Sequence, residues 1–203
     1  MAPPIETGAD SVSRAVRLVR LFHRDPDAFA RFVAVEATAV PQPFRGLLDH
    51  ASHMTVAMER LYGGPVDVVV KGVCVNDVGA ADGREWYERE ILLRSPAGNV
   101  VQHGIVRLDL ARVSPSVTAD IRAGKRPLGR ILIEAGMLLD VQRVALVRVD
   151  VGPEFRALVG DDAVTAASPG HTFGRVAEIA LDGVRAVELL EVVVPGPLPK
   201  VLP

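Results

Sequence analysis

The sequence has few of the features that crosslink a protein or anchor it in a membrane. Its 203 residues include a single cysteine, Cys74, so an intramolecular disulfide bond is excluded. The start of the chain, MAPPIETGAD, has neither the basic segment nor the apolar segment of a signal peptide. Charged residues or glycine interrupt every apolar run before it reaches the roughly 18 residues that a membrane-spanning helix needs. We therefore expect a cytoplasmic protein with no membrane partner.

The chain also lacks a charge excess and has few aromatic residues. The formal net charge is -2 at pH 7, so nucleic acid is not expected as a partner. Aromatic residues make up 4% of the sequence and apolar residues 49%, which predicts an aliphatic core. This apolar content suits one globular unit. We expect a flexible leader over residues 1–10 and a single domain over residues 11–203.

Several common catalytic motifs are missing. The sequence contains no G-x-S-x-G, G-x-G-x-x-G, Walker A or H-E-x-x-H motif, so the usual hydrolase, nucleotide-binding and zinc-protease interpretations lose support. The best metal candidate is the segment DHASH, in which Asp49, His50 and His53 lie close together. Because flanking ligands are missing, a solvated loop or the start of a helix is the favoured interpretation. We expect no metal and no other cofactor.

The first third of the chain shows helical patterns. Apolar residues recur at helical spacing in residues 11–22 and 54–64, and the second segment ends in two glycines. Residues 27–37 are also predicted to be helical, with Asp25 or Asp27 as the cap.

From Val66 onwards the pattern changes to strands. Segments rich in β-branched residues alternate with short turns such as SPAGN and LDG, which indicates an antiparallel sheet of about six strands. Between the third and fourth strands, residues 114–124 and 126–136 predict a helix-turn-helix excursion, with Ser114 as the cap. The fold class is therefore α+β. The helical pair either roofs a cavity or covers a sheet face. The six predicted strands are residues 66–75, 85–94, 99–110, 141–151, 174–183 and 184–195.

Two predicted strands carry charged residues at positions that face inwards. In WYEREILL, strand alternation groups Arg89 with Tyr87, Ile91 and Leu93. Arg89 either pairs with a buried carboxylate, reaches past the sheet edge, or binds an anionic ligand through its planar fork.

In AVELLEVVVP, Glu188 and Glu191 lie on opposite faces, each among aliphatic residues. An acid on a buried face tends to have a raised pKa and can donate a proton. The periodicity leaves open which glutamate faces a cavity.

The remaining candidates favour structural roles. His103 shares a strand face with Val101 and Ile105, so a partly buried histidine that donates to the backbone is favoured over a catalytic one. Cys74 stands among valines and is expected to be a small core residue. His171, in a loop rich in glycine and proline, is left without a role.

Four segments together resemble the chorismate pyruvate-lyase family. The resemblance covers the chain from about residue 27 to its C-terminus. It implies an α+β fold with an antiparallel sheet and a ligand buried under helix-turn-helix flaps. It also implies a cofactor-free carbon–oxygen lyase that converts the small-molecule substrate chorismate into 4-hydroxybenzoate and pyruvate. The segments, in this order, are HMT (53–55), YEREILL (87–93), GKRPLGRIL (124–132) and ELLEVVVPGPLP (188–199).

The same resemblance implies a set of site residues. Arg89 would clamp the ring carboxylate, while the backbone of Met54 and of Leu128 would contact the substrate. Glu191, chosen over Glu188, would face the ring oxygen at C4 and donate or share a proton. Arg89 and Glu191 are thus the expected catalytic residues.

This chain is one residue longer than the family pattern between Gly174 and Glu191. We therefore expect a bulge near LDG to keep Glu191 on the cavity face.

Some alternatives stay open. Lys125, Arg126 and Arg130 are candidates for binding the second carboxylate of the substrate. The fold of the family also resembles the effector-binding domain of a family of bacterial transcription regulators, which binds a small acid without catalysis. We expect no DNA-binding domain like the one those regulators carry, because few residues precede the core in this sequence. A related lyase acting on another enolpyruvyl or aromatic acid is a further possibility, and the chain is expected to be a monomer or a small homo-oligomer.

Overall fold

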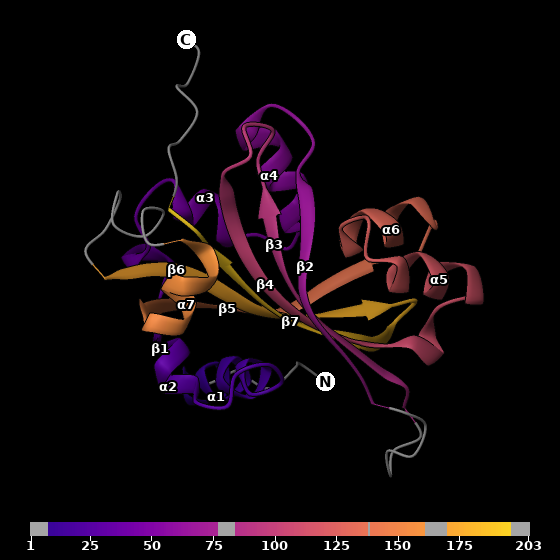
Figure 1. Cartoon of the computed structure of the whole chain (residues 1–203), viewed down its shortest axis with the longest axis horizontal. Helices are drawn as coiled ribbons and strands as arrows, with labels where there is room; N and C mark the ends of the chain where they lie inside the picture. The colour runs from indigo at the N-terminus through magenta and orange to yellow at the C-terminus, as the bar shows by residue number, and fades with distance from the viewer. Residues whose placement is uncertain (1–7, 77–83, 138, 161–169, 196–203) are drawn as a thin grey trace.

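One twisted sheet organises the molecule. The computed structural model describes residues 8–76, 84–137, 139–160 and 170–195. Seven antiparallel strands follow the order β1-β5-β6-β7-β4-β3-β2, which confirms the α+β class and the antiparallel sheet (Figure 1). The strands are β1 (Ala30–Val35), β2 (Asp67–Asn76), β3 (Trp86–Arg94), β4 (Val100–Asp109), β5 (Leu139–Val151), β6 (His171–Leu181) and β7 (Val184–Val193).

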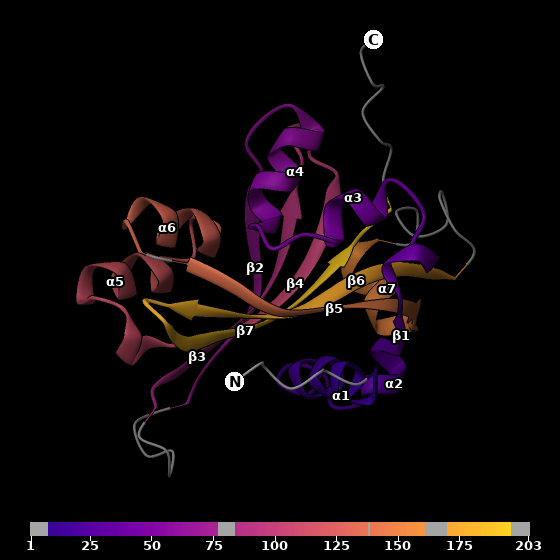
Figure 2. The same cartoon turned by 180° about the vertical axis from the view of Figure 1, so that it is seen from behind.

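Helices cover both faces of the sheet. Figures 1 and 2 show α1 and α2 on one side, and α3, α4, α5 and α6 on the other. Helix α7 belongs to the α1 side, because Phe155 packs in the same apolar cluster as Leu18. None of the helices in the described part of the chain is long and apolar enough to span a membrane. The helices are α1 (Gly8–Val19), α2 (Pro26–Phe29), α3 (Phe44–Leu48), α4 (Met54–Tyr62), α5 (Pro115–Ala123), α6 (Leu128–Glu134) and α7 (Pro153–Val159), with short 3-10 turns at Ala37–Ala39 and Leu110–Arg112.

The helix ends follow the local signals in the sequence. The hydroxyl group of Ser114 accepts a hydrogen bond from the amide of Val117 and caps α5, as predicted. Gly63 and Gly124 end α4 and α5 in the left-handed conformation, with φ of 69° and 65°. Helix α1 begins at Gly8, earlier than predicted, while residues 1–7 of the expected leader lie outside the described residues.

The predicted helix over residues 27–37 is wrong. Asp25 does cap a helix, but α2 ends at Phe29, and Ala30–Val35 forms the edge strand β1 paired with β5. Ala30 and Phe32 are buried while Arg31 is exposed, which is the alternation of a strand. The backbone groups of β5 and the β-branched valines favour the extended form over the helical propensity. The sheet therefore has seven strands rather than about six.

The bulge expected near LDG is present. The pairing of β6 with β7 shifts register between Ile179 and Ala180, just before the turn that joins the two strands. Beyond that shift Arg175 lies opposite Glu191, and Glu191 lies opposite Gly104 of β4. The register therefore brings Glu191 beside the middle of the sheet.

A polar cluster lies inside the core on the α1 side. His103 is fully buried, and its Nε2 lies 2.9 Å from the carboxylate of Glu90, so the expectation of a backbone partner is wrong. His23 contacts the same carboxylate at 2.7 Å and reaches Glu154 with its other ring nitrogen. Burial raises the pKa of Glu90, but the hydrogen bonds from His103 and His23 outweigh it and lower the pKa to about 2. The cluster therefore holds a carboxylate in its ionised form within the core.

Two other residues singled out in the sequence lie at strand positions. Cys74 is half-buried on the edge strand β2, so it is not the core residue expected. His171 begins β6, and its ring packs against that of Phe173.

The Glu90 cluster makes a pH-dependent contribution to stability. Because the folded pKa of Glu90 lies below its ordinary value of 4.5, its stabilisation is complete above pH 4.5 and is lost as the pH falls towards 2. Glu90→Gln should lower the free energy of unfolding by about 2–3 kcal/mol near neutral pH. Urea titrations of both proteins should show this difference shrinking below pH 4.5. Glu85→Gln, which removes an exposed pair with Arg122, should cost less than about 1 kcal/mol, and a pH-independent difference for Glu90→Gln would contradict the assignment.

Candidate functional site

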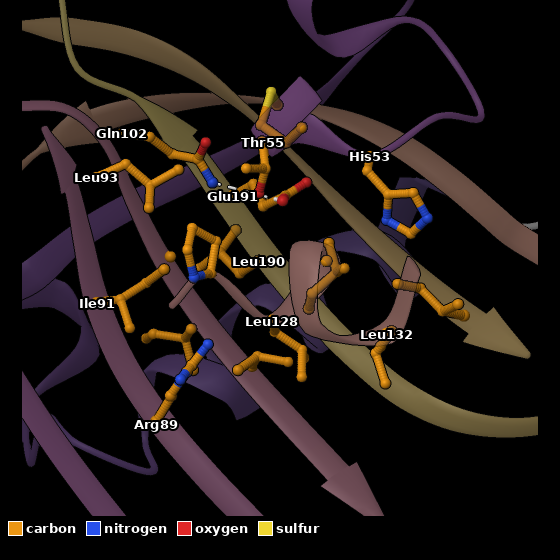
Figure 3. Close-up of a pocket in the computed structure, with 18 residues that line it drawn as sticks. His53, Thr55, Arg89, Ile91, Leu93, Gln102, Leu128, Leu132, Leu190 and Glu191 are labelled. Carbon is orange, nitrogen blue, oxygen red and sulfur yellow. Dashed lines mark hydrogen bonds between the residues drawn. The ribbon is translucent and has the colours of Figure 1, made fainter. Parts of the chain in front are cut away.

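A cavity lies on the sheet face under α4 and α6. All four residues named for the site, Met54, Arg89, Leu128 and Glu191, line it (Figure 3). The cavity separates two apolar clusters, one under α5 and α6 and the other under α3 and α4. The structure thus brings together residues that are far apart in the chain.

The floor of the cavity follows from the strand register. Arg89 of β3 lies opposite Val106 of β4, and Ile91 lies opposite Gly104, which in turn lies opposite Glu191 of β7. Arg89 and Glu191 therefore share one sheet face. They lie two strands apart and are offset by two residues along the strand direction. Strand spacings place their Cα atoms roughly 12 Å apart.

This separation sets the length of a ligand that touches both head groups. Side chains stand roughly perpendicular to a sheet, so the two heads keep about the same separation as their Cα atoms. Hydrogen bonds of about 2.8 Å at each end leave roughly 6 Å for the ligand. A benzene ring with a carboxylate at one end and an oxygen at the other has this length.

The Arg89 guanidinium is buried, and its nitrogens lack hydrogen-bond partners among the residues that the structure describes. The residue is 0% exposed, and none of its three side-chain nitrogens makes a hydrogen bond of normal geometry to a described residue. Burial lowers its pKa and the nearby Tyr87 hydroxyl partly offsets this effect, but a guanidinium stays charged in proteins. A buried charge without a partner is costly, so the position suits an anion that arrives with a ligand.

Glu191 faces the cavity at a distance from Arg89, as Figure 3 shows. Its carboxylate pairs with Nε of Arg175 at 2.7 Å and accepts a longer hydrogen bond from the amide of Gln102. Glu188 points to the opposite face and pairs with Arg17 of α1. The structure therefore places Glu191, and not Glu188, at the cavity.

Arg175 holds this end of the cavity in place, and the sequence reasoning missed it. The side chain is 1% exposed. Besides Glu191, it donates to the backbone carbonyl groups of His50 and Ser52, at 2.7 and 3.0 Å. The signal was available, because Arg175 occupies an inward position of the strand pattern just as Arg89 does. Its contacts fix the loop that leads into α4.

The two helices contribute backbone groups and apolar side chains. Met54 is the first residue of α4, so its amide has no acceptor within the helix and can face an anion. Leu128, the first residue of α6, lines the cavity together with Leu132. The Arg130 side chain pairs with Glu59 and ties α6 to α4.

The flap cations do not reach the cavity. Lys125, Arg126 and Arg130 are absent from its described lining. Arg126 pairs with Asp120 and Glu134 on the outside of the flap. These three residues are therefore poorly placed to bind a second carboxylate in this conformation.

The DHASH segment is not a metal site in this structure. Within the described residues, no group of three His, Cys, Asp or Glu side chains could hold a metal ion. The Nδ1 atom of His50 accepts from the amide of Ser52 and lies 3.3 Å from Arg175. His53 precedes α4 and lines the cavity instead.

The cavity is small in this conformation. Its volume is about 60 Å³. That is room for a few water molecules, whereas an engineered apolar cavity that binds benzene measures about 150 Å³. A ring can enter only if α6 moves outwards or the Leu128 and Leu132 side chains turn away.

Comparisons with known proteins support the fold. The sequence matches no protein-family model and no curated protein. The structure is similar to PhnF from Mycobacterium smegmatis, with 15% identity and a TM-score of 0.51 over 71% of this chain and 64% of PhnF. Its effector domain alone gives 15% identity and a TM-score of 0.50 over 71% of this chain and 88% of the domain. A GntR-family transcriptional regulator from Bacillus cereus is 11% identical, with a TM-score of 0.45 over 68% of this chain and 99% of that one.

The likeness to PhnF defines a class of fold. The chain has the α+β fold of the PhnF effector domain. The matched part spans less than two thirds of the length of PhnF itself.

The unpaired state of Arg89 gives a prediction about stability. Replacing a buried charge with an apolar side chain of similar shape is often neutral or stabilising by about 1–4 kcal/mol. Arg89→Met should therefore keep or raise the free energy of unfolding, which urea titration of both proteins measures. A destabilisation of several kcal/mol would mean that Arg89 has a partner in the folded protein.

Arg175 offers the matched contrast. Arg175→Met removes one member of a buried ion pair and leaves the Glu191 carboxylate without its partner, which costs about 3–5 kcal/mol. Chemical denaturation should therefore show a large loss of stability, opposite in direction to Arg89→Met. Equal effects of the two substitutions would contradict the distinction between a structural arginine and a ligand-binding one.

Proposed function

We propose that the protein is a chorismate lyase that forms 4-hydroxybenzoate and pyruvate. The observation that carries the proposal is the buried guanidinium of Arg89, which makes no hydrogen bond of normal geometry to a described residue, in an apolar cavity whose other end presents the carboxylate of Glu191. The four segments that resemble the lyase family supply three walls of this cavity: HMT at α4, YEREILL in β3 and the PLGR segment at α6. The fourth supplies Glu191, although its end, residues 196–199, lies outside the described residues.

The carboxylate and hydroxyl groups of chorismate match the chemistry of the two ends of the cavity. Chorismate carries a ring carboxylate at C1, an enolpyruvyl ether at C3 and a hydroxyl group at C4. In our proposal Arg89 grips the ring carboxylate with two parallel hydrogen bonds. The C4 hydroxyl group, opposite the carboxylate, then lies at Glu191. This arrangement uses the separation that the strand register sets.

The reaction needs little chemical help from the protein. The C3–O bond breaks, the hydrogen on C4 leaves, and the enolpyruvyl methylene carbon gains a hydrogen to become the methyl group of pyruvate. The C4 hydrogen and the methylene carbon are the two ends of a six-membered cyclic array, so a direct transfer between them balances all atoms and electrons. Formation of the aromatic ring drives the step. The protein mainly has to hold the reacting groups in this geometry and exclude water.

The ion pair with Arg175 changes the role that we assign to Glu191. A carboxylate already paired with a guanidinium is suited to accept a hydrogen bond from the C4 hydroxyl group. We therefore replace the expected proton donor with an orienting acceptor. The acceptor fixes the ring so that the C4 hydrogen meets the enolpyruvyl methylene carbon.

Flap movement follows from the size of the cavity. Because about 60 Å³ is too little for the ring, we propose that α6 opens to admit chorismate and again to release the product. The apolar contacts of Leu132 and Ile131 with the sheet oppose this opening. Product release is therefore expected to be slow.

A second candidate function is sensing of a small acid without catalysis. It is favoured by the similarity to the effector domain of PhnF. The same Arg89 site would then bind an aromatic or other planar carboxylate, and the position of the flap would depend on whether the ligand is bound. Binding alone does not separate this function from the lyase, whereas turnover does.

The test is turnover of chorismate by the purified protein. We expect pyruvate and 4-hydroxybenzoate in equal amounts, measured by a coupled enzymatic assay and by chromatography. Arg89→Met should lower kcat/KM by at least about 100-fold, because one charge-assisted bidentate contact supplies about 3 kcal/mol. Glu191→Gln should bind chorismate but turn over more slowly.

The controls separate the candidates. Glu188→Gln changes the acid on the opposite sheet face and should leave kcat/KM unchanged. Binding of chorismate without release of pyruvate would remove the lyase proposal and favour the sensor. Pyruvate with a different hydroxybenzoate isomer would favour a related lyase.

A further inference from the structure

We propose that His53 binds the second carboxylate of the substrate, the one on the enolpyruvyl group, and so selects for dicarboxylates. The inference rests on the proposed function, in which Arg89 holds the ring carboxylate. It assigns a role that neither the fold likeness nor the resemblance in sequence supplies.

The position of His53 supports this role. It is the capping residue of α4, and its half-buried ring lines the cavity apart from Arg89 (Figure 3). The ring packs against α6, because a Cβ atom built on Gly129 would lie 3.3 Å from the Nδ1 atom of His53. The imidazole therefore stands where the α4 end and the flap meet over the ligand.

The hydrogen-bonding capacity of the ring is unused. No hydrogen bond joins the His53 side chain to any residue of the described chain. Burial lowers the pKa of His53, while the neighbouring Glu191 raises it and Arg175 lowers it. A neutral imidazole still offers one N–H donor, and an arriving carboxylate favours the protonated form with two donors.

The guanidinium and the side-chain amide at the Glu191 end of the cavity are already committed. The guanidinium of Arg175 donates hydrogen bonds to Glu191 and to two backbone carbonyl groups. Gln102 donates to Glu191. Once Arg89 holds the ring acid, His53 is the remaining side chain in the described lining that can carry a positive charge.

The reaction geometry gives this contact a purpose. A carboxylate held at the α4 end turns the enolpyruvyl group about its ether bonds, which are otherwise free to rotate. Fixing both carboxylates leaves the methylene carbon one position over the ring, next to C4. His53 thus orients the moving part of the substrate while Arg89 and Glu191 orient the ring.

The experiment compares two ligands that differ in their acidic groups. 4-Hydroxybenzoate has one carboxylate, while 3-(1-carboxyvinyloxy)benzoate adds the enolpyruvyl carboxylate on a ring that cannot react. Calorimetry on the wild-type protein and His53→Gln should show the dicarboxylate weakened about 10-fold or more and 4-hydroxybenzoate changed less than about two-fold. His171→Gln, which changes a histidine outside the cavity, should bind both ligands as the wild type does.

Each outcome has a distinct meaning. If His53→Gln weakens both ligands equally, His53 only holds the flap in place and the inference is overturned; if it weakens neither, His53 is not a contact. If the wild-type protein binds neither ligand, or if Arg89→Met still binds both, the proposed function fails and the inference fails with it. Unchanged binding of 4-hydroxybenzoate by His53→Gln also shows that this variant is folded.

Discussion

The structure depends on a buried positive charge that the protein itself does not neutralise. Arg89 lies on β3, next to the edge strand β2, and lines the cavity. Burying such a group without a hydrogen-bond partner among the described residues lowers stability. Substituting Arg89 with Met or Leu would remove the free-energy cost of this buried charge. A chain that keeps the arginine gives up stability for a strong contact with an anion that enters from outside.

The two buried arginines of the site show how context assigns different tasks to the same side chain. Arg175 has partners for all its nitrogens: it pairs with Glu191 and donates hydrogen bonds to the loop before α4. These contacts offset the free-energy cost of burying its charge. Arg89 has the opposite arrangement: the Tyr87 hydroxyl is nearby, but none of its nitrogens makes a hydrogen bond of normal geometry to a described residue. The first arginine makes the site rigid, and the second leaves one contact for the ligand to complete.

Most strands of the sheet and the residues at both ends of the site could be predicted from the sequence. The elements that were predicted wrongly have physical explanations. Strand alternation placed Arg89 on an inward face without any structure, because a period of two needs only the local sequence. Residues 30–35 were misassigned because their helical propensity is local while their pairing with β5 is not. The choice of Glu191 over Glu188 came from the family resemblance, because periodicity does not say which face of β7 borders the cavity; in the structure Glu191 lies opposite Gly104 of β4.

The contacts of the site were harder to predict than its members. Arg175 pairs with Glu191 of the neighbouring strand, and His103 pairs with Glu90 in the core. Sequence periodicity predicts the sheet face of a residue but not its partner. Cys74 looked like a core residue because its neighbours are valines, but β2 turned out to be the edge strand. The burial of a residue that depends on the order of strands in the sheet therefore cannot be predicted from the local sequence pattern.

An enzyme and a sensor can share this cavity because the proposed reaction asks for no dedicated acid or base. If hydrogen transfer occurs within the substrate, catalysis depends on how tightly the enolpyruvyl group is oriented and not on a new type of residue. A sensor of a planar acid needs Arg89 and a flap, while a lyase also needs the ring and the side arm fixed together. The step from one to the other would then require only a few oriented contacts at the α4 end of the cavity, where Glu191, Arg175 and His53 meet.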